Sequence, residues 1–259
     1  MKIVADAGHS YETAGKRTID GSMREWEFNN AVANYLKKNL EQYRDVEVLF
    51  AHDPSGKIDI PLDKRTDYAN KIKADCFISI HANAFGTSWN DANGIETFVY
   101  KKNFALKDAV KLAGNVQNAL VKHSGLRDRG VKEGNFAVLR DTKMTSILIE
   151  CGFMTNRKEA ELLKSDNYRQ VCAFAICEGI AQTYNLVKKV NLVEKPYEPL
   201  FKPSTNALKN GFKSYLQSAI DKKIIHSTEG IEKLDQGTLL LSDAVGYIAT
   251  IEDRKNKAN

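Results

Sequence analysis

The chain lacks the features of membrane, secreted and disulfide-stabilised proteins. No apolar run approaches the roughly 18 residues that a membrane-spanning helix needs, so we expect no membrane span. The first apolar run is short and is interrupted by Asp6, so we expect no signal peptide and synthesis in the cytoplasm. The four cysteines lie in apolar contexts without Cys-x-x-Cys spacing, which predicts buried, reduced thiols.

Strong charge, internal repeats and low-complexity stretches are also missing. The net charge of +5 is too modest to indicate a nucleic-acid partner. Only five prolines occur, and three of them lie at positions 196, 199 and 203. This clustering predicts a stiff linker over 191–203, between a larger domain over 1–190 and a small one over 204–259.

The first 190 residues alternate between short β-branched runs and longer amphipathic stretches. Strands are expected over 1–6, 46–50, 76–80, 94–100, 136–139 and 146–149. Helices are expected over 24–43, 62–73, 104–123, 157–163 and 167–186, the last two capped by Asn156 and Asn167. The alternation predicts an α/β fold with a twisted, mostly parallel sheet flanked by helices. The small C-terminal domain is expected to be mainly helical, with helices over 204–222 and 242–254 and a turn over 224–228.

Three of the predicted strands lead into side chains that suit catalysis. His81 ends the apolar run of the third strand, His9 lies just beyond the first, and Glu150 follows the sixth. Parallel strands of an open α/β sheet end at one edge, where ligands commonly bind. Two imidazoles and a carboxylate at one edge are side chains that a zinc hydrolase site uses.

A catalytic zinc usually takes three protein ligands, so a third ligand is needed from another element. Glu25 and Glu27 both lie in the first turn of the first helix. Two residues apart on a helix, they point about 200° away from each other, so only one can face the site. Glu25 shares a face with Asn29 and Glu27 shares one with Asn30, so the spacing leaves both candidates open.

Other polar residues have plainer interpretations. His52, His123 and His226 show no partner pattern, and we expect them to be structural. Arg65 lies on a helix face, where an arginine is more often packed or ion-paired than functional. Asn83 comes shortly after His81 and is a candidate for orienting a ligand or a peptide.

Taken in order, these segments resemble the zinc-dependent N-acetylmuramoyl-L-alanine amidases of the type-3 amidase family. The matching motifs are Asp6-Ala7-Gly8-His9, Glu25 with Asn29, the block over 65–83, the strand over 94–97, and Glu150 through Asn156. The resemblance covers about residues 1–188. The chain departs from the family at Met144-Thr145, where the usual proline is missing, and after His9, where it is not glycine-rich.

The resemblance implies that His9, Glu25 and His81 hold Zn²⁺, which decides between Glu25 and Glu27. It also implies that Glu150 is the catalytic acid and base. The implied reaction is hydrolysis of the amide between N-acetylmuramic acid and L-alanine in peptidoglycan. A carboxypeptidase acting on the stem peptide shares this zinc chemistry but not the order of the motifs.

The C-terminal segment over 204–259 faintly resembles helical wall-anchoring modules. Its acidic and basic residues nearly balance, so we expect shape-specific binding to a wall glycan or secondary polymer of a Gram-positive host. The plainer alternative is a packing or dimerisation module. The whole pattern resembles a bacteriophage or prophage endolysin, which a holin releases from the host cytoplasm to the wall. The alternatives are a host autolysin that acts in mother-cell lysis and a wall-binding protein with a dead amidase domain.

Overall fold

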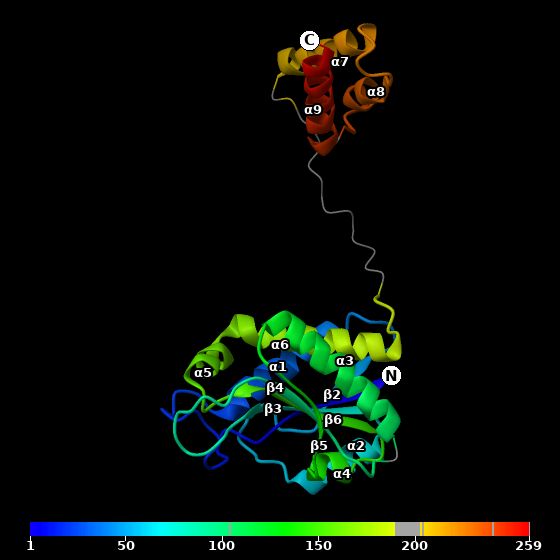
Figure 1. Ribbon diagram of the computed structural model, residues 1–259. Helices are drawn as coiled ribbons and strands as arrows, with labels where there is room; N and C mark the ends of the chain where they lie inside the picture. Colours follow the sequence, from blue (N-terminus) through cyan, green and yellow to red (C-terminus); the bar gives the residue numbers. More distant parts are fainter. Residues whose placement is uncertain (104, 190–202, 204, 240, 259) are drawn as a thin grey trace. The chain divides into compact units, whose positions relative to one another are not determined.

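The computed structural model describes residues 1–103, 105–189, 203, 205–239 and 241–258 (Figure 1). These residues belong to two compact units, Met1–Lys189 and Val190–Asn259. The predicted linker over 191–203 lies outside the described residues except for Pro203.

The first unit is built on a six-stranded sheet with the order β2-β1-β3-β6-β4-β5. Its strands are β1 (Lys2–Ala7), β2 (Glu47–Phe50), β3 (Cys76–Asn83), β4 (Ile95–Val99), β5 (Asp128–Glu133) and β6 (Thr145–Phe153). The pairs β2–β1, β1–β3, β3–β6 and β4–β5 are parallel, and only the pair β6–β4 of this sheet is antiparallel. The prediction of an α/β fold with a mostly parallel sheet is therefore confirmed.

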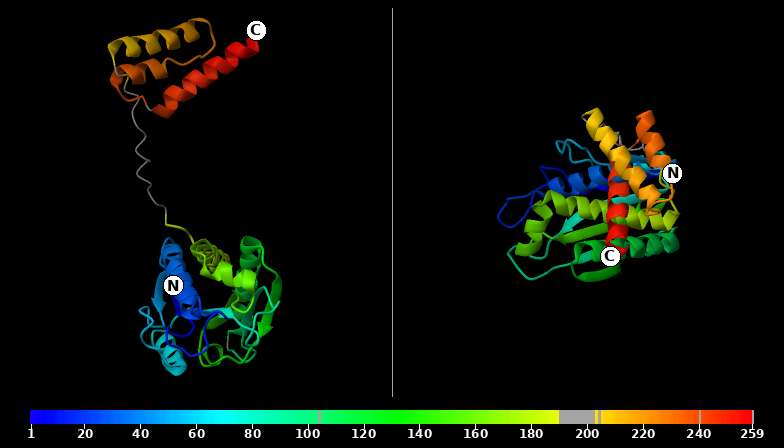
Figure 2. Two further views of the ribbon diagram at one scale, coloured as in Figure 1. Left: turned by 90° about the vertical axis from the view of Figure 1, so that its left-hand side faces the viewer. Right: turned by 90° about the horizontal axis from the view of Figure 1, so that it is seen from above.

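Helices cover the two faces of this sheet unequally (Figures 1 and 2). Those of the first unit are α1 (Glu25–Leu40), α2 (Leu62–Lys71), α3 (Leu106–Ser124), α4 (Ala137–Arg140), α5 (Arg157–Lys164) and α6 (Asp166–Tyr184). The larger apolar core lies between the sheet and α1, α3 and α6, and α6 packs against the other two. The short helices α2 and α4 cover the opposite face.

The helix α1 shows how the sequence produces this packing. Its buried positions Phe28, Val32, Leu36 and Leu40 recur every four residues, which places them along one face of the helix. Each such side chain contributes about 1.5–3 kcal/mol when it is fully buried. The same helix therefore anchors its first turn firmly over the sheet.

Strand alternation decides which polar residues face the thinner layer. Phe77 of β3 and Leu148 of β6 belong to the smaller core beside α2 and α4. Side chains two or four positions farther along a strand point to the same face, so His81 and Glu150 also lie on this side. The two residues are register partners across the β3–β6 pair. The thin helical layer leaves a cavity over this end of the face.

Two predictions about strands are wrong. Residues 136–139 form the turn that opens α4 rather than a strand, since the Arg140 N–H donates to the Phe136 carbonyl at 2.9 Å. A four-residue apolar run does not by itself distinguish a strand from a buried helical turn. The strand β5 was not predicted because it is polar and carries charged residues, a common composition for an edge strand.

Helix starts were predicted with mixed success. Asn156 does cap α5, where its side chain accepts the N–H groups of Lys158 and Glu159. Asn167 is not a cap, because α6 already begins at Asp166 after Ser165.

The cysteines are buried and free, as predicted. No helix within the described ranges is long and apolar enough to span a membrane.

The described part of the second unit is helical, as expected. Its helices are α7 (Asn206–Asp221), α8 (Glu229–Gln236) and α9 (Leu241–Ala258). The short helix α8 was not predicted, because it falls between two longer apolar patterns. Leu216, Ile225 and Ile251 form one small core, and Leu234 with Leu239 belongs to another.

Candidate metal centre

His9 reaches the site because the chain turns sharply after β1. Its backbone has φ of 67°, in the left-handed region that few residues other than glycine adopt. Such strain is typical of functional positions, where the surrounding structure enforces it. A Cβ atom on the preceding Gly8 would lie 2.0 Å from Cε1 of His81, so only glycine allows this approach. The Gly8-His9 pair is therefore shaped around the second histidine.

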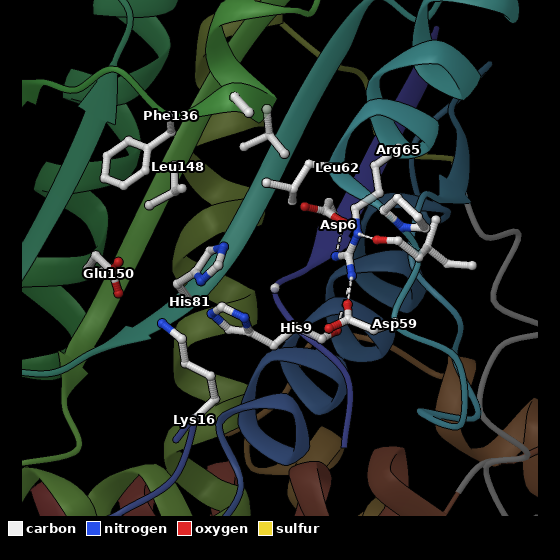
Figure 3. A pocket seen from close by; sticks show the side chains of 15 residues that line it. Asp6, His9, Lys16, Asp59, Leu62, Arg65, His81, Phe136, Leu148 and Glu150 are labelled. Carbon is white, nitrogen blue, oxygen red and sulfur yellow. Dashed lines mark hydrogen bonds and ion pairs between the residues drawn. The ribbon is translucent and has the colours of Figure 1, made fainter. Parts of the chain in front are cut away.

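The imidazoles of His9 and His81 lie close together, and Glu25 joins them from the first turn of α1. The two rings meet edge to face, and their centroids are 5.1 Å apart. Figure 3 shows the two side chains next to each other. The Glu25 carboxylate lies 3.0 Å from Nδ1 of His81 and 3.4 Å from Nε2 of His9. Asn29, one helical turn later, donates both to Glu25 at 3.3 Å and to the Gly8 carbonyl at 3.0 Å. This asparagine couples the helix start to the turn that carries His9.

The structure separates the roles of Glu25 and Glu27. Glu25 is buried against the two histidines, and its carboxylate also accepts the Ala82 N–H at 3.2 Å. Glu27 instead accepts the Arg24 N–H at 2.6 Å, which closes the first turn of α1. The carboxylate beside the imidazoles is therefore that of Glu25, and Glu27 is a helix cap.

The donor set fits a zinc ion. One ligand atom from each of His9, Glu25 and His81 can be chosen so that all lie within 4.8 Å of one another. Two imidazole nitrogens and one carboxylate oxygen are a common three-ligand set for catalytic zinc. Burial would raise the pKa of Glu25, but the hydrogen bond and charge of His81 lower it. Burial lowers the pKa of His9 to about 4, which favours the neutral imidazole that a metal requires.

Glu150 lies on β6 beside this cluster and lines the same cavity (Figure 3). Its Oε2 atom is buried and has no hydrogen-bond partner among the described residues. Burial raises the pKa of Glu150 to about 8, although the charge of His81 opposes the shift. A half-buried carboxyl group with one buried, unpartnered oxygen in a cavity is a candidate acid or base.

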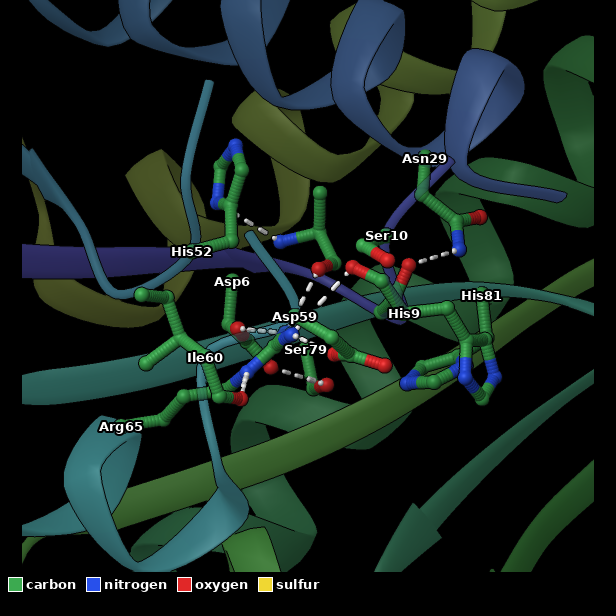
Figure 4. Close-up of polar contacts among 12 residues, drawn as sticks. Asp6, His9, Ser10, Asn29, His52, Asp59, Ile60, Arg65, Ser79 and His81 are labelled. Atoms are coloured by element: carbon green, nitrogen blue, oxygen red, sulfur yellow. Dashed lines mark hydrogen bonds and ion pairs between the residues drawn. The ribbon is translucent and has the colours of Figure 1, made fainter. Parts of the chain in front are cut away.

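A second charged cluster lies next to the first, around Arg65 of α2 (Figure 4). Its guanidinium donates to Asp6 at 2.8 Å, and Asp6 also accepts the hydroxyl of Ser79 at 2.9 Å. The other acceptors of Arg65 are Asp59 and the carbonyls of Ala7, His9 and Ile60. All five guanidinium N–H groups can therefore be paired within the protein.

The remaining polar candidates have hydrogen-bond or ion-pair partners outside the His–Glu–His cluster, or are exposed. His52 accepts the Ala7 N–H at Nδ1, and burial lowers its pKa to about 4, so it acts as a neutral structural group. Asn83 donates to Glu96 at 2.7 Å. His123 pairs with Glu178 on α6. His226 is exposed in the second unit.

The cavity of about 570 Å³ also contains residues that sequence reasoning missed. Leu62, Phe136, Val138 and Leu148 form its apolar wall, and Lys16 lines it from the loop after His9. The apolar residues carried no signal beyond ordinary core patterning. Lys16 lies in a loop without periodicity, so only the fold reveals its position.

A His–Glu–His cluster beside a buried carboxylate, at the edge of an α/β sheet, is typical of hydrolases that act through a metal centre. A family model described as N-acetylmuramoyl-L-alanine amidase matches residues 3–182. The chain therefore belongs to the N-acetylmuramoyl-L-alanine amidase family, which is a family of hydrolases.

Curated relatives include cell wall amidases and an endolysin. An uncharacterised cell wall amidase of Bacillus anthracis is 36% identical over 191 residues, 70% of this chain and 35% of that protein. The amidase CwlM of Bacillus licheniformis is 32% identical over 80% of this chain and 78% of its own length. The endolysin of Bacillus phage SPP1 is 32% identical over 71% of this chain and 66% of its own. The matched region thus spans about a third of the B. anthracis relative.

Solved structures confirm the amidase fold. The catalytic domain of CwlV, an amidase from Paenibacillus polymyxa, is 31% identical with a TM-score of 0.65. The similarity covers 72% of this chain and 99% of that domain. An amidase from Clostridium difficile is 32% identical with a TM-score of 0.66, over 71% of this chain and 96% of the other.

Proposed function

We propose that this protein is a zinc-dependent N-acetylmuramoyl-L-alanine amidase that cleaves the bond between N-acetylmuramic acid and L-alanine in peptidoglycan. The observation that carries the proposal is the convergence of His9, Glu25 and His81 beside the unpartnered Glu150, in a chain of this family. His9, Glu25 and His81 would hold the zinc. When bound, zinc supplies a Lewis acid that polarises a carbonyl group and makes water more acidic.

The side chains of the protein then divide the remaining work. Glu150 accepts a proton from the attacking water and delivers it to the leaving amine of L-alanine. Positive charge at the cluster favours the ionised form of Glu150, which the base step requires. Asn29 holds the Glu25 carboxylate and the Gly8 carbonyl, so it keeps the ligand set aligned.

For the second unit we propose a wall-binding role, with residues 1–190 as the catalytic domain, 191–203 as the linker and 204–259 as the binding domain. The small apolar cores of α7, α8 and α9 support a module that folds, as shape-specific binding would require. Deleting 195–259 and measuring sedimentation with intact Gram-positive walls tests the role. Unchanged binding would favour a packing or dimerisation module instead.

The setting that we propose is a phage or prophage endolysin, made in the host cytoplasm and released to the wall by a holin. The relative from phage SPP1 supports this setting. Host amidases, including the sporulation-specific amidase of Bacillus subtilis at 29% identity, support the autolysin alternative. Lysis from within by the protein alone, compared with lysis when a holin is co-expressed, separates the two settings.

Mass spectrometry of digested peptidoglycan, with and without a chelator, tests the reaction. We expect chelator-sensitive release of stem peptides with N-terminal L-alanine, together with intact glycan strands. Cut glycans or shortened stem peptides would show that another bond is cleaved. A zinc-loaded protein that releases nothing from several Gram-positive walls would support a dead amidase domain that only binds.

A further inference from the structure

The cavity beside the His–Glu–His cluster is lined by two basic side chains in very different states. Arg65 has its guanidinium N–H groups directed at five acceptors of the protein itself. Lys16 is exposed, and no hydrogen bond or ion pair of its ammonium group is found among the described residues. In Figure 3 its side chain points toward the rings of His9 and His81. Lys16 therefore offers a positive charge that the protein does not neutralise by direct contact.

The backbone of Lys16 is fixed relative to the cluster. Its carbonyl accepts the N–H of Glu25 at 2.9 Å, so the loop is bonded to the first residue of α1. The next residue of the loop, Arg17, forms an antiparallel β-bridge with Arg24, the residue before Glu25. The helix that supplies Glu25 thus also sets the position of the lysine, and only the Lys16 side chain remains to adjust to a ligand.

Lys16 lines the same cavity as His9, His81 and Glu150. A substrate bound in this cavity therefore comes within reach of the Lys16 side chain. An anionic substrate group is the natural partner of such a lysine, because ammonium pairs strongly with carboxylate.

We propose that Lys16 forms a carboxylate-binding subsite, which holds a free carboxylate of the peptide stem next to the amide that is cleaved. The inference rests on the proposed function, since it assumes that a peptidoglycan stem enters this cavity. Under it, the enzyme prefers stems with free carboxylates over stems in which these groups are carboxamides. Lys16 is then a specificity-determining residue of the reaction.

A matched pair of substrates tests the preference. One peptidoglycan preparation is divided, and one half is amidated with carbodiimide and ammonia. Initial rates of release of N-terminal L-alanine give kcat/KM for each half. We expect the wild-type protein to prefer the untreated half by about fivefold to tenfold, the range for a charged hydrogen bond partly screened by solvent. The preference should shrink as salt is added.

Variants assign the preference to one side chain. Lys16→Met should lower kcat/KM on the untreated half and abolish the preference, whereas Lys16→Arg should retain most of it. Lys107→Met removes an exposed charge from α3, outside the cavity lining, and should keep the preference. Zinc content should be equal in all four proteins, which shows that the cluster is intact.

Each other outcome overturns a definite statement. A wild-type preference that persists in Lys16→Met, or an equal loss on both halves, overturns the subsite. The equal loss would mean that Lys16 acts through Glu150 rather than on the substrate. If the wild-type protein prefers neither half, there is no subsite although the amidase is real. If it releases no N-terminal alanine at all, the proposed function fails and the inference fails with it.

Discussion

Two charged clusters lie side by side at the same edge of the sheet, and they differ in how completely they are satisfied. Around Arg65, the guanidinium, the Asp6 carboxylate and the Ser79 hydroxyl are matched to partners inside the protein. Around Glu25, two imidazoles face one carboxylate, and the nearby Glu150 keeps a buried oxygen without a partner among the described residues. Burial and charge are common to both clusters, so neither property identifies the functional one.

The difference lies in the capacity that remains for a ligand. A closed network holds the chain together, and breaking one member leaves its partners buried and unpaired. An open network is costly to the isolated protein but keeps lone pairs available for a metal or a substrate. Substitutions in the first cluster should therefore act on stability, and those in the second on metal binding and turnover.

Arg65→Leu should have the largest effect on stability. The change leaves Asp6 buried without its counter-charge, and breaking a buried pair in this way costs about 3–5 kcal/mol. Such a loss is a large part of the total free energy of unfolding of an ordinary domain. Urea unfolding followed by circular dichroism measures it. The matched control is Arg140→Leu, whose exposed pair with Asp141 should leave the midpoint nearly unchanged. A midpoint for Arg65→Leu as high as that of the control would contradict the structural role.

Glu25→Gln should abolish zinc binding and activity while the fold survives. The amide keeps the shape of the side chain but removes the negative ligand, so we expect zinc affinity to fall on the order of 10²-fold or more. The metal-free protein should stay folded but become modestly less stable, because the amide oxygen can still accept the Ala82 N–H while the interaction with His81 that lowers the pKa of Glu25 is lost. Zinc titration and urea unfolding check the two halves of this prediction.

Glu27→Gln is the control for the ligand assignment, since it changes a carboxylate only two residues away. It should keep zinc and activity and weaken only the start of α1, where Glu27 accepts the Arg24 N–H. His81→Ala should lose both metal and activity, like Glu25→Gln. Loss of zinc in Glu27→Gln with retention in Glu25→Gln would reverse the assignment.

Glu150→Gln should separate metal binding from turnover. Removing a positioned acid and base lowers the rate by about 10²–10⁴-fold, while zinc stays bound because no proposed ligand is changed. Zinc content and initial rates on peptidoglycan, measured on the same sample, test the split. Glu133→Gln, an exposed carboxylate at the end of β5, should leave both quantities unchanged. Full activity in Glu150→Gln would remove Glu150 from the mechanism.

Much of this comparison could be predicted from the sequence. His9 lies just beyond β1, His81 near the end of β3 and Glu150 within the second half of β6, and these strands run parallel. The sequence pattern could therefore predict that the three side chains meet at one edge of the sheet. The choice between Glu25 and Glu27 could not be made from helical spacing. It depends on where the first turn of α1 sits over the sheet, which is a tertiary property.

The closed and open states of the two clusters could not be predicted either. The sequence predicts that Arg65 is packed or ion-paired. It does not predict that two carboxylates and three backbone carbonyls accept all of the guanidinium hydrogen bonds. Lys16 and the apolar wall at Leu62 and Phe136 gave no local signal, because loops and short apolar runs acquire their role only from their neighbours. Polar edge strands such as β5 escape for the same reason.

Glu159→Gln should lower stability less than Arg65→Leu does, and it should leave zinc binding unchanged. Glu159 of α5 is another buried carboxylate, and its two oxygens accept the N–H groups of Gly94 and Phe153, each at 2.7 Å. Glu159 is therefore part of a closed network, in which both carboxylate oxygens are paired, although burial raises the pKa of Glu159. A glutamine has only one acceptor oxygen, so its amide nitrogen would face one of these N–H groups. Leaving that donor unpaired costs about 1–3 kcal/mol.

Urea unfolding should show this loss of stability in Glu159→Gln, with zinc content and activity retained. The control variant Glu161→Gln, at an exposed neighbouring position, should show no loss. A Glu159→Gln protein with wild-type stability but impaired turnover would place this carboxylate with the open cluster and would contradict the rule that closed networks are structural.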